Sequence, residues 1–247
     1  TLVFIDSTQG WLVTDNGTQD TAPTSQYVTA TGGTITCSGD YRIHTFTGPG
    51  ALCVSCAGNA AGSNTVDYLV VAGGGGGGGY VHGGGGGAGG FRESSGAASG
   101  CYTASPLGAC VSALPVAVQP YTVTVGGGGG GYTAPSCTNG QGTPGSNSTF
   151  SSITSTGGGG GNANTFPSGL TGGSGSGGSC VGSNSPSTIG AGNTPPVSPP
   201  QGNPGTAANY NGPNYGYSSG GGATSSGTAG TTTTGGAGGN GATTSIS

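Results

Sequence analysis

The chain has 247 residues, of which 63 are glycine, and its formal net charge at pH 7 is −4. It contains only two arginines, which excludes a basic patch for binding nucleic-acid phosphates. It contains no lysine, which excludes the Walker A loop that binds nucleotide phosphates. Leu, Ile, Val and Phe together number 33, and 25 of them precede residue 126. A conventional hydrophobic core is therefore expected only in the first half of the chain.

The first 72 residues contain short segments rich in β-branched and aromatic residues, separated by Gly, Asn, Asp and Pro. These segments are 1–5, 10–14, 25–30, 33–37, 40–46, 51–57 and 66–72. Their spacing, with turn residues between them, predicts an antiparallel β unit of the sandwich or jelly-roll kind over residues 1–72. No 3.6-residue apolar stripe is present, so almost no α-helix is expected.

Pure glycine runs follow: residues 72–90 read AGGGGGGGYVHGGGGGAGG, and runs return at 125–131 and 156–161. Glycine loses more backbone entropy on ordering than any other residue, so such runs either stay disordered or pack where only a missing side chain fits. The low charge and the β-type segments before the runs favour packing over a flexible linker. We expect polyglycine II helices, threefold and extended, in which six residues span roughly 19 Å and neighbouring helices supply hydrogen-bond partners.

The predicted fold class is thus all-β and irregular: a short antiparallel β-sandwich unit followed by a polyglycine II sandwich over residues 73–247. Residues 73–90 are expected to form an antiparallel pair of glycine helices, and strands near 116–125 to pack back on the first unit. The glycines predicted to be required for packing are Gly76, Gly85, Gly128 and Gly159. A valine at Gly76 or Gly128 is expected to disrupt the sandwich.

No residue pattern predicts catalysis, a metal site or a cofactor. Cys53 and Cys56 have a metal-like spacing, but residues three apart on a strand face opposite sides, which favours buried thiols or separate disulfides. Seven cysteines cannot all pair within a monomer. His44 is expected to face solvent or to form a hydrogen bond. No nucleophile elbow follows a strand and precedes a helix, so an enzyme is not expected.

Tyrosines are the candidate binding residues. Tyr68, Tyr80 and Tyr132 flank glycine runs and are expected to cap the packed layers. The segment 209–219 reads NYNGPNYGYSS, a mixture that combines stiff aromatic surfaces with adaptable hydrogen bonds, as in recognition loops. The predicted receptor-binding residues are Tyr210, Asn211, Asn214, Tyr215 and Tyr217, together with His82 between two glycine runs. Neutral sugars or exposed protein loops would suit such a surface.

Several stretches carry a resemblance to a known group of proteins. They are residues 30–50, 66–80, 83–102, 121–131 and 193–203, which include DYLVVAGGGGGGG and GGFRESSG. In these stretches the chain resembles glycine-rich tail proteins of tailed bacteriophages, especially marine and cyanobacterial phages. The resemblance implies a virion protein of the tail fibre or tail tip. More loosely, the chain is similar to phage adhesins in which loops on a polyglycine sandwich contact the host.

The expected function is therefore adhesion: a phage tail component that binds a bacterial surface glycan or outer-membrane protein, located in the virion or outside the cell. The expected partners also include other tail or filament subunits and further copies of the chain, but neither nucleic acid nor a membrane. The alternative is a purely structural extracellular filament or fibre-shaft subunit without a receptor. Relatives with more glycine runs suggest that Ser247 is the edge of a fragment.

Overall fold

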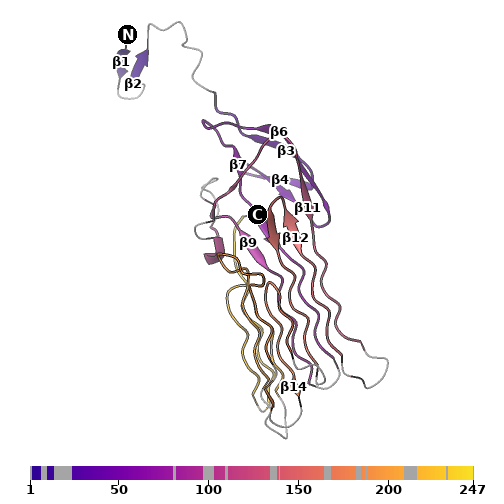
Figure 1. The fold of residues 1–247 in the computed structure, drawn as a ribbon. Helices are drawn as coiled ribbons and strands as arrows, with labels where there is room; N and C mark the ends of the chain where they lie inside the picture. Colours follow the sequence, from indigo (N-terminus) through magenta and orange to yellow (C-terminus); the bar gives the residue numbers. More distant parts are fainter. Residues whose placement is uncertain are drawn as a thin grey trace.

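The computed structural model is an elongated molecule in which a β head continues into a bundle of glycine-rich segments (Figure 1). It is nearly all β, and the described residues contain no α-helix, only the 3₁₀ turn η2 (Pro106–Gly108). The predicted fold class is thereby confirmed. The structure describes residues 2–6, 10–13, 24–79, 82–96, 103–108, 111–133, 138, 140–163, 168–181, 185–186, 188–208, 216–231 and 233–246.

The head is built on a five-stranded antiparallel sheet. Its strand order is β13 (Ile153–Ser155), β12 (Ser148–Phe150), β11 (Pro120–Thr124), β6 (Gly50–Ala57) and β3 (Val28–Thr31). Burial alternates along the central strands, as the pleat of a strand requires for a sheet with one buried face. The buried side chains form one cluster, Ala30, Leu52, Val54, Val116 and Tyr121.

Smaller antiparallel pairs complete the β structure. They are β1 (Leu2–Asp6) with β2 (Gly10–Val13), β4 (Thr34–Ser38) with β5 (Tyr41–Thr45), β7 (Thr65–Val66) with β10 (Leu114–Pro115), β8 (Leu69–Val71) with β9 (Phe91–Glu93), and β14 (Cys180–Val181) with β15 (Ser185–Pro186). Tyr68, Val70 and Ile153 form a second buried cluster. The head therefore draws strands from both before and after the first glycine runs.

The glycine runs are joined by backbone hydrogen bonds with a period of three. In the run 72–79, the amides of Ala72, Gly75 and Gly78 donate to the carbonyls of Gly90, Gly87 and Gly84 at 2.9–3.0 Å. The next residue in each triplet, Gly73, Gly76 and Gly79, donates instead to Ser146, Thr143 and Gly140. Three residues per turn, with every bond directed to a neighbouring segment, is the pattern of polyglycine II. The runs 72–79 and 83–90 are antiparallel.

The centre of the sandwich is the run 156–163. From Gly157 to Ala163 every residue is buried. A Cβ atom added at any glycine from Gly157 to Gly161 would lie 1.9–2.1 Å from a carbonyl oxygen of a neighbouring run. No side chain fits at such a distance. The stretch is therefore pure glycine, because the backbones of neighbouring runs lie too close to every one of these residues.

Serine replaces glycine in the adjacent run 172–179, which is also buried throughout. The Ser174 hydroxyl donates to the Gly222 carbonyl at 3.1 Å, the Ser179 hydroxyl donates to the Ala163 carbonyl at 2.8 Å, and the Ser176 hydroxyl accepts from the Leu170 amide at 2.9 Å. Each buried hydroxyl thus has a backbone partner, as burial of a polar group demands.

Candidate functional site

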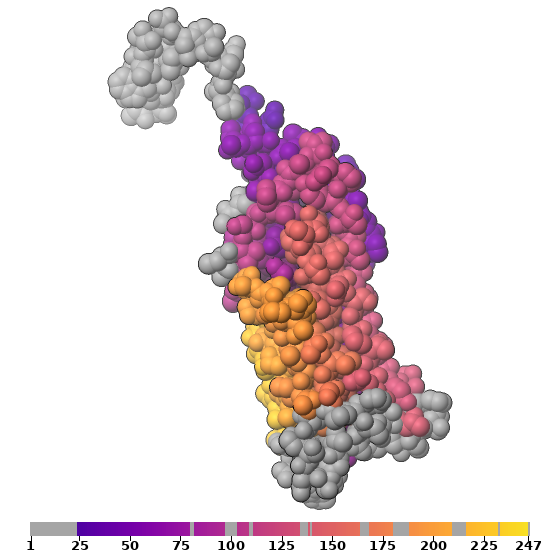
Figure 2. Space-filling model, viewed as in Figure 1, coloured from indigo at the N-terminus to yellow at the C-terminus, as the bar shows by residue number. Residues whose placement is uncertain are grey.

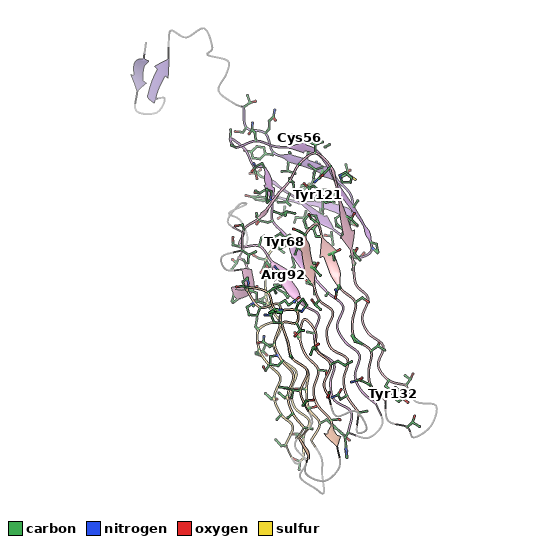
Figure 3. The ribbon with its side chains drawn as sticks, viewed as in Figure 1. Cys56, Tyr68, Arg92, Tyr121 and Tyr132 are labelled. Carbon is green, nitrogen blue, oxygen red and sulfur yellow. The ribbon has the colours of Figure 1, made fainter. Side chains whose placement is uncertain are left out.

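The glycine runs reverse direction at two ends of the sandwich. One end adjoins the head, where the β12–β13 hairpin connects two runs. The other, which we call the distal end, lies away from the head, where Figure 1 shows β14 and Figure 3 shows Tyr132. Described residues that belong to the distal end include Gly79, His82, Tyr132, Asn162 and Tyr217. The space-filling view shows the elongated body in which the sandwich continues from the head (Figure 2).

His82 and Tyr217 come from different runs and meet at the distal end. Their ring centroids are 6.3 Å apart with an interplanar angle of 43°. Tyr217 is 47% exposed, whereas the next residue, Ser218, is buried and its hydroxyl donates to the Gly178 carbonyl. His82 has a φ of 60°, a left-handed conformation that is uncommon for a side-chain-bearing residue. The pair therefore presents an aromatic surface on a backbone anchored by the sandwich.

Tyr132 closes another part of the distal end. Its hydroxyl lies 2.8 Å from the Thr138 hydroxyl, and its ring covers Gly79 and Gly140, where an added Cβ would lie 2.7 Å and 1.9 Å from ring carbons. Gly79 and Gly140 are joined by a hydrogen bond of 3.0 Å. Tyr132 thus acts as a cap on the ends of two runs.

A polar cluster lies beside this cap. The Gln141 side-chain amide donates to the Asn162 Oδ1 at 2.7 Å and to the Ser168 carbonyl at 3.3 Å. Asn162 is fully buried, and its Nδ2 has no hydrogen-bond partner among the described residues. These contacts join two connections of the distal end, the one that precedes Gln141 and the one between Asn162 and Ser168.

The structure brings together two of the predicted receptor-binding residues, His82 and Tyr217. The predicted residues Tyr210, Asn211, Asn214 and Tyr215 lie outside the described part of the chain. The contact between His82 and Tyr217 joins positions 135 residues apart in the sequence, and no local pattern indicated that they are neighbours.

The predicted packing glycines differ from one another in their surroundings. A Cβ at Gly76 would lie 2.1 Å from the Gly130 carbonyl oxygen, and one at Gly159 would lie 1.9 Å from the Leu170 carbonyl oxygen. At Gly85 the nearest atom would be the Gly220 nitrogen at 3.2 Å. At Gly128 it would be the Gly74 carbonyl oxygen at 3.7 Å, which is ordinary contact. The expectation of a packing requirement at Gly128 is therefore wrong, because its run lies at the edge of the sandwich.

The chemistry-bearing residues of the head occupy separate places. Cys53 is exposed and Cys56 is partly buried on the other face of β6, and both are free thiols, as is the exposed Cys37. The His44 Nδ1 lies 2.8 Å from the Gly32 carbonyl oxygen, so that residue forms a hydrogen bond. Among the residues that the structure describes, no three His, Cys, Asp or Glu side chains gather as they would to hold a metal ion.

Among the residues that the structure describes, Tyr68 is the titratable group with a clear pKa shift. Burial in the second hydrophobic cluster raises the pKa of its phenol, the positive charge of Arg92 lowers it, and the negative charge of Asp67 raises it again. Figure 3 shows Tyr68 near Arg92, where the head joins the sandwich. Tyr68 is only 8% exposed, which suits the packing role predicted from its position beside a glycine run.

Two fully buried polar side chains hold the junction of head and sandwich, and the sequence pattern did not reveal them. Gln201 accepts a hydrogen bond from the Thr156 amide at 2.8 Å and donates to the Pro195 carbonyl at 3.2 Å. Glu93 accepts from the Ser105 amide at 2.8 Å and from the Thr244 hydroxyl. Each joins segments far apart in the chain, which is why local sequence gave no sign of its role.

No helix in the described part of the chain is long and apolar enough to cross a membrane. Among curated proteins and solved structures, none is significantly similar to this chain. A family model described as a glycine-rich domain matches residues 55–247, from within β6 through all the glycine runs. The chain therefore belongs to this family of glycine-rich domain proteins.

Proposed function

We propose that the protein is a tail-fibre or tail-tip component of a bacteriophage virion, and that its distal end binds a receptor on the bacterial surface. The observation that carries this proposal is the His82–Tyr217 pair, which exposes an aromatic ring at the end of a rigid sandwich. An exposed aromatic surface beside polar backbone suits a neutral glycan or an outer-membrane protein loop.

The contrast between a rigid sandwich and the connections at its distal end supports the same function. Binding residues are commonly placed on connections that a rigid scaffold positions. Here the scaffold has hydrogen bonds between neighbouring runs along its whole length, and its centre has no room for a side chain. Such a scaffold tolerates changes in its distal connections without loss of the fold, which suits a protein that must match variable receptors.

The first experiment tests binding to cells with a matched control. Labelled protein is incubated with marine and cyanobacterial isolates, and bound protein is measured by flow cytometry. Replacing Tyr217 by alanine should reduce binding to the responsive strain by about tenfold or more, because buried or stacked tyrosines commonly dominate binding surfaces. Tyr27, 65% exposed near the head, is the control, and Tyr27→Ala should bind like the wild type. Equal binding by both variants and the wild type would contradict the proposal.

The alternative function is a structural filament or fibre-shaft subunit that binds no receptor. The length of the sandwich and its dense hydrogen bonding favour it as much as adhesion. Immunogold electron microscopy of virions with an antibody to the head distinguishes the two. Gold at the distal ends of tail fibres supports an adhesin, whereas gold spaced along a fibre or filament supports a shaft subunit.

A further inference from the structure

An open groove of about 450 Å³ runs along one side of the sandwich. Three segments line it: residues 85–88, residues 218–221, and residues 236, 238 and 239. Ala88, Ser218 and Ser219 supply its only side chains, and the hydroxyls of both serines donate to backbone carbonyls. The groove walls are therefore almost entirely polyglycine backbone.

The groove is long enough for part of one polyglycine chain. Four successive residues along a wall span about 12 Å at a rise of 3.1 Å. Because the walls carry almost no side chains, a bare backbone can approach them as the runs of the interior approach one another. The groove therefore offers a position for a further run in the polyglycine array.

The groove also presents hydrogen-bonding groups that the sandwich itself does not use. Among the described residues, neither the amide nor the carbonyl of Gly86 and Gly238 has a hydrogen-bond partner. Gly238 is exposed, and a Cβ added there would have no atom within 4 Å. Gly84 and Gly87 of the same run donate to the Asn162 and Gly159 carbonyls in the interior, whereas Gly86 and Gly238 line the open groove.

A matching ridge lies at the opposite edge of the sandwich, formed by residues 126–131 (Figure 1). The backbone of Gly129 donates to the Gly74 carbonyl at 2.8 Å, which ties this run to the interior. Gly128 and Gly131, one turn of the threefold helix apart, are exposed, and their amides and carbonyls have no partner in the part of the chain that the structure describes.

Four glycines of this ridge, at positions 127, 128, 130 and 131, are not required by the packing of their own molecule, whereas an added Cβ at Gly126 or Gly129 would lie 2.1 Å or 1.9 Å from a carbonyl oxygen. An added Cβ would have no neighbour within 4 Å at Gly127, and would meet its nearest atom at 3.7–3.8 Å at Gly128, Gly130 and Gly131. Alanine would order with a smaller loss of entropy at such positions. Close contact with the backbone of another molecule would explain why these exposed positions are glycine, because close contact between backbones is the reason for glycine in the interior runs.

We propose that the ridge 126–131 of one molecule inserts into the groove of a second copy of this chain. The inserted run extends the polyglycine array across the boundary, with hydrogen bonds to the groups of Gly86 and Gly238. Because ridge and groove are different surfaces, the contact is heterologous, and it builds a ring or an open filament. This association does not depend on whether the distal end binds a receptor.

The test uses two substitutions that the monomer tolerates. Gly128→Val blocks the ridge, and Gly238→Val blocks the groove; neither added Cβ comes closer than 3.7 Å to another atom. Analytical ultracentrifugation should show concentration-dependent assemblies for the wild type and monomers for each variant alone. An equimolar mixture of the two variants should form dimers and nothing larger, because only one intact ridge and one intact groove remain between the two molecules.

The control is Gly48→Val in a loop of the head, where an added Cβ also has no neighbour within 4 Å. This variant should assemble like the wild type, and at a concentration where the wild type is monomeric all three variants should keep the wild-type melting temperature. A wild type that stays monomeric at all concentrations overturns the proposal. So do single variants that assemble as the wild type does. Dimers of one variant alone would show a symmetric contact and would likewise overturn the ridge-in-groove arrangement.

Discussion

The head and the polyglycine sandwich are stabilised in opposite ways. In the head, alternating strand residues such as Leu52, Val54 and Tyr121 bury apolar side chains in a conventional core. In the sandwich, the run 157–161 has no side chains, and its stability comes from backbone hydrogen bonds and close backbone contact. A core of side chains accepts other apolar residues of similar volume, whereas the centre of the sandwich accepts glycine alone.

The largest effect is expected from Gly159→Val at the centre of the sandwich. The added Cβ would lie 1.9 Å from the Leu170 carbonyl oxygen, so the runs must separate. We expect a loss of about 3 kcal/mol or more in the free energy of unfolding, at or above the upper range for overpacking. Gly241→Ala, where the added Cβ has no neighbour within 4 Å, is the control and should be neutral or slightly stabilising. Urea denaturation measures both, and equal stabilities would refute backbone packing as the basis of the sandwich.

A comparable test of the head is Leu52→Ala. Leu52 is 6% exposed and pairs with Tyr121 across β6 and β11. Loss of its side chain should lower the free energy of unfolding by about 2–4 kcal/mol, through lost burial and a cavity. Separate transitions for head and sandwich in differential scanning calorimetry would show that the two regions unfold independently. A single shifted transition would show that they are one cooperative unit.

A smaller effect is expected at the junction of the two regions, from Gln201→Leu. Leucine has similar volume but leaves the Thr156 amide and the Pro195 carbonyl without their side-chain partners. Unpaired buried polar groups should cost about 2 kcal/mol. Thermal unfolding followed by circular dichroism measures the loss. A melting temperature unchanged from the wild type would mean that water replaces the amide at this position.

The smallest effect is a pH dependence at Tyr68. Its pKa is raised in the folded protein, so the folded state favours the neutral phenol. The associated stability is complete below the unfolded pKa of about 10 and is lost as pH rises through the higher folded value. Unfolding by urea should therefore become easier above about pH 10 in the wild type, and less so in Tyr68→Phe. Parallel pH profiles for the two proteins would assign the dependence to other groups.

Local patterns in the sequence predicted the kind of structure in each region. Alternation along 51–57 and 121–125 indicated strands, and the structure has β6 and β11 there. The glycine runs indicated polyglycine II, and the period of three in their hydrogen bonds agrees with it. Both patterns depend only on a residue and its near neighbours in the chain, which is why the sequence alone could predict them.

The candidate site was predicted only in part. Composition predicted binding residues in the tyrosine-rich segment and at His82. Whether these residues lie close together depends on the order of the runs in the sandwich, which composition does not specify. Likewise, sequence could not separate Gly76 from Gly128, because both lie in pure glycine runs. Only the position of each run, interior or edge, decides whether a side chain would fit.

The sequence by itself determined the low charge, the lack of α-helix among the described residues and the threefold backbone of the glycine runs, because these follow from residue type and local conformation. The tertiary structure alone decided which runs are neighbours, which glycines are covered, and which buried groups such as Gln201 and Glu93 join the two regions. The physical reason is that the glycine runs have identical backbones and no side chains, so nothing in a run itself specifies which other run lies beside it. Their order in the array is set by the connections between runs and by the head to which they return.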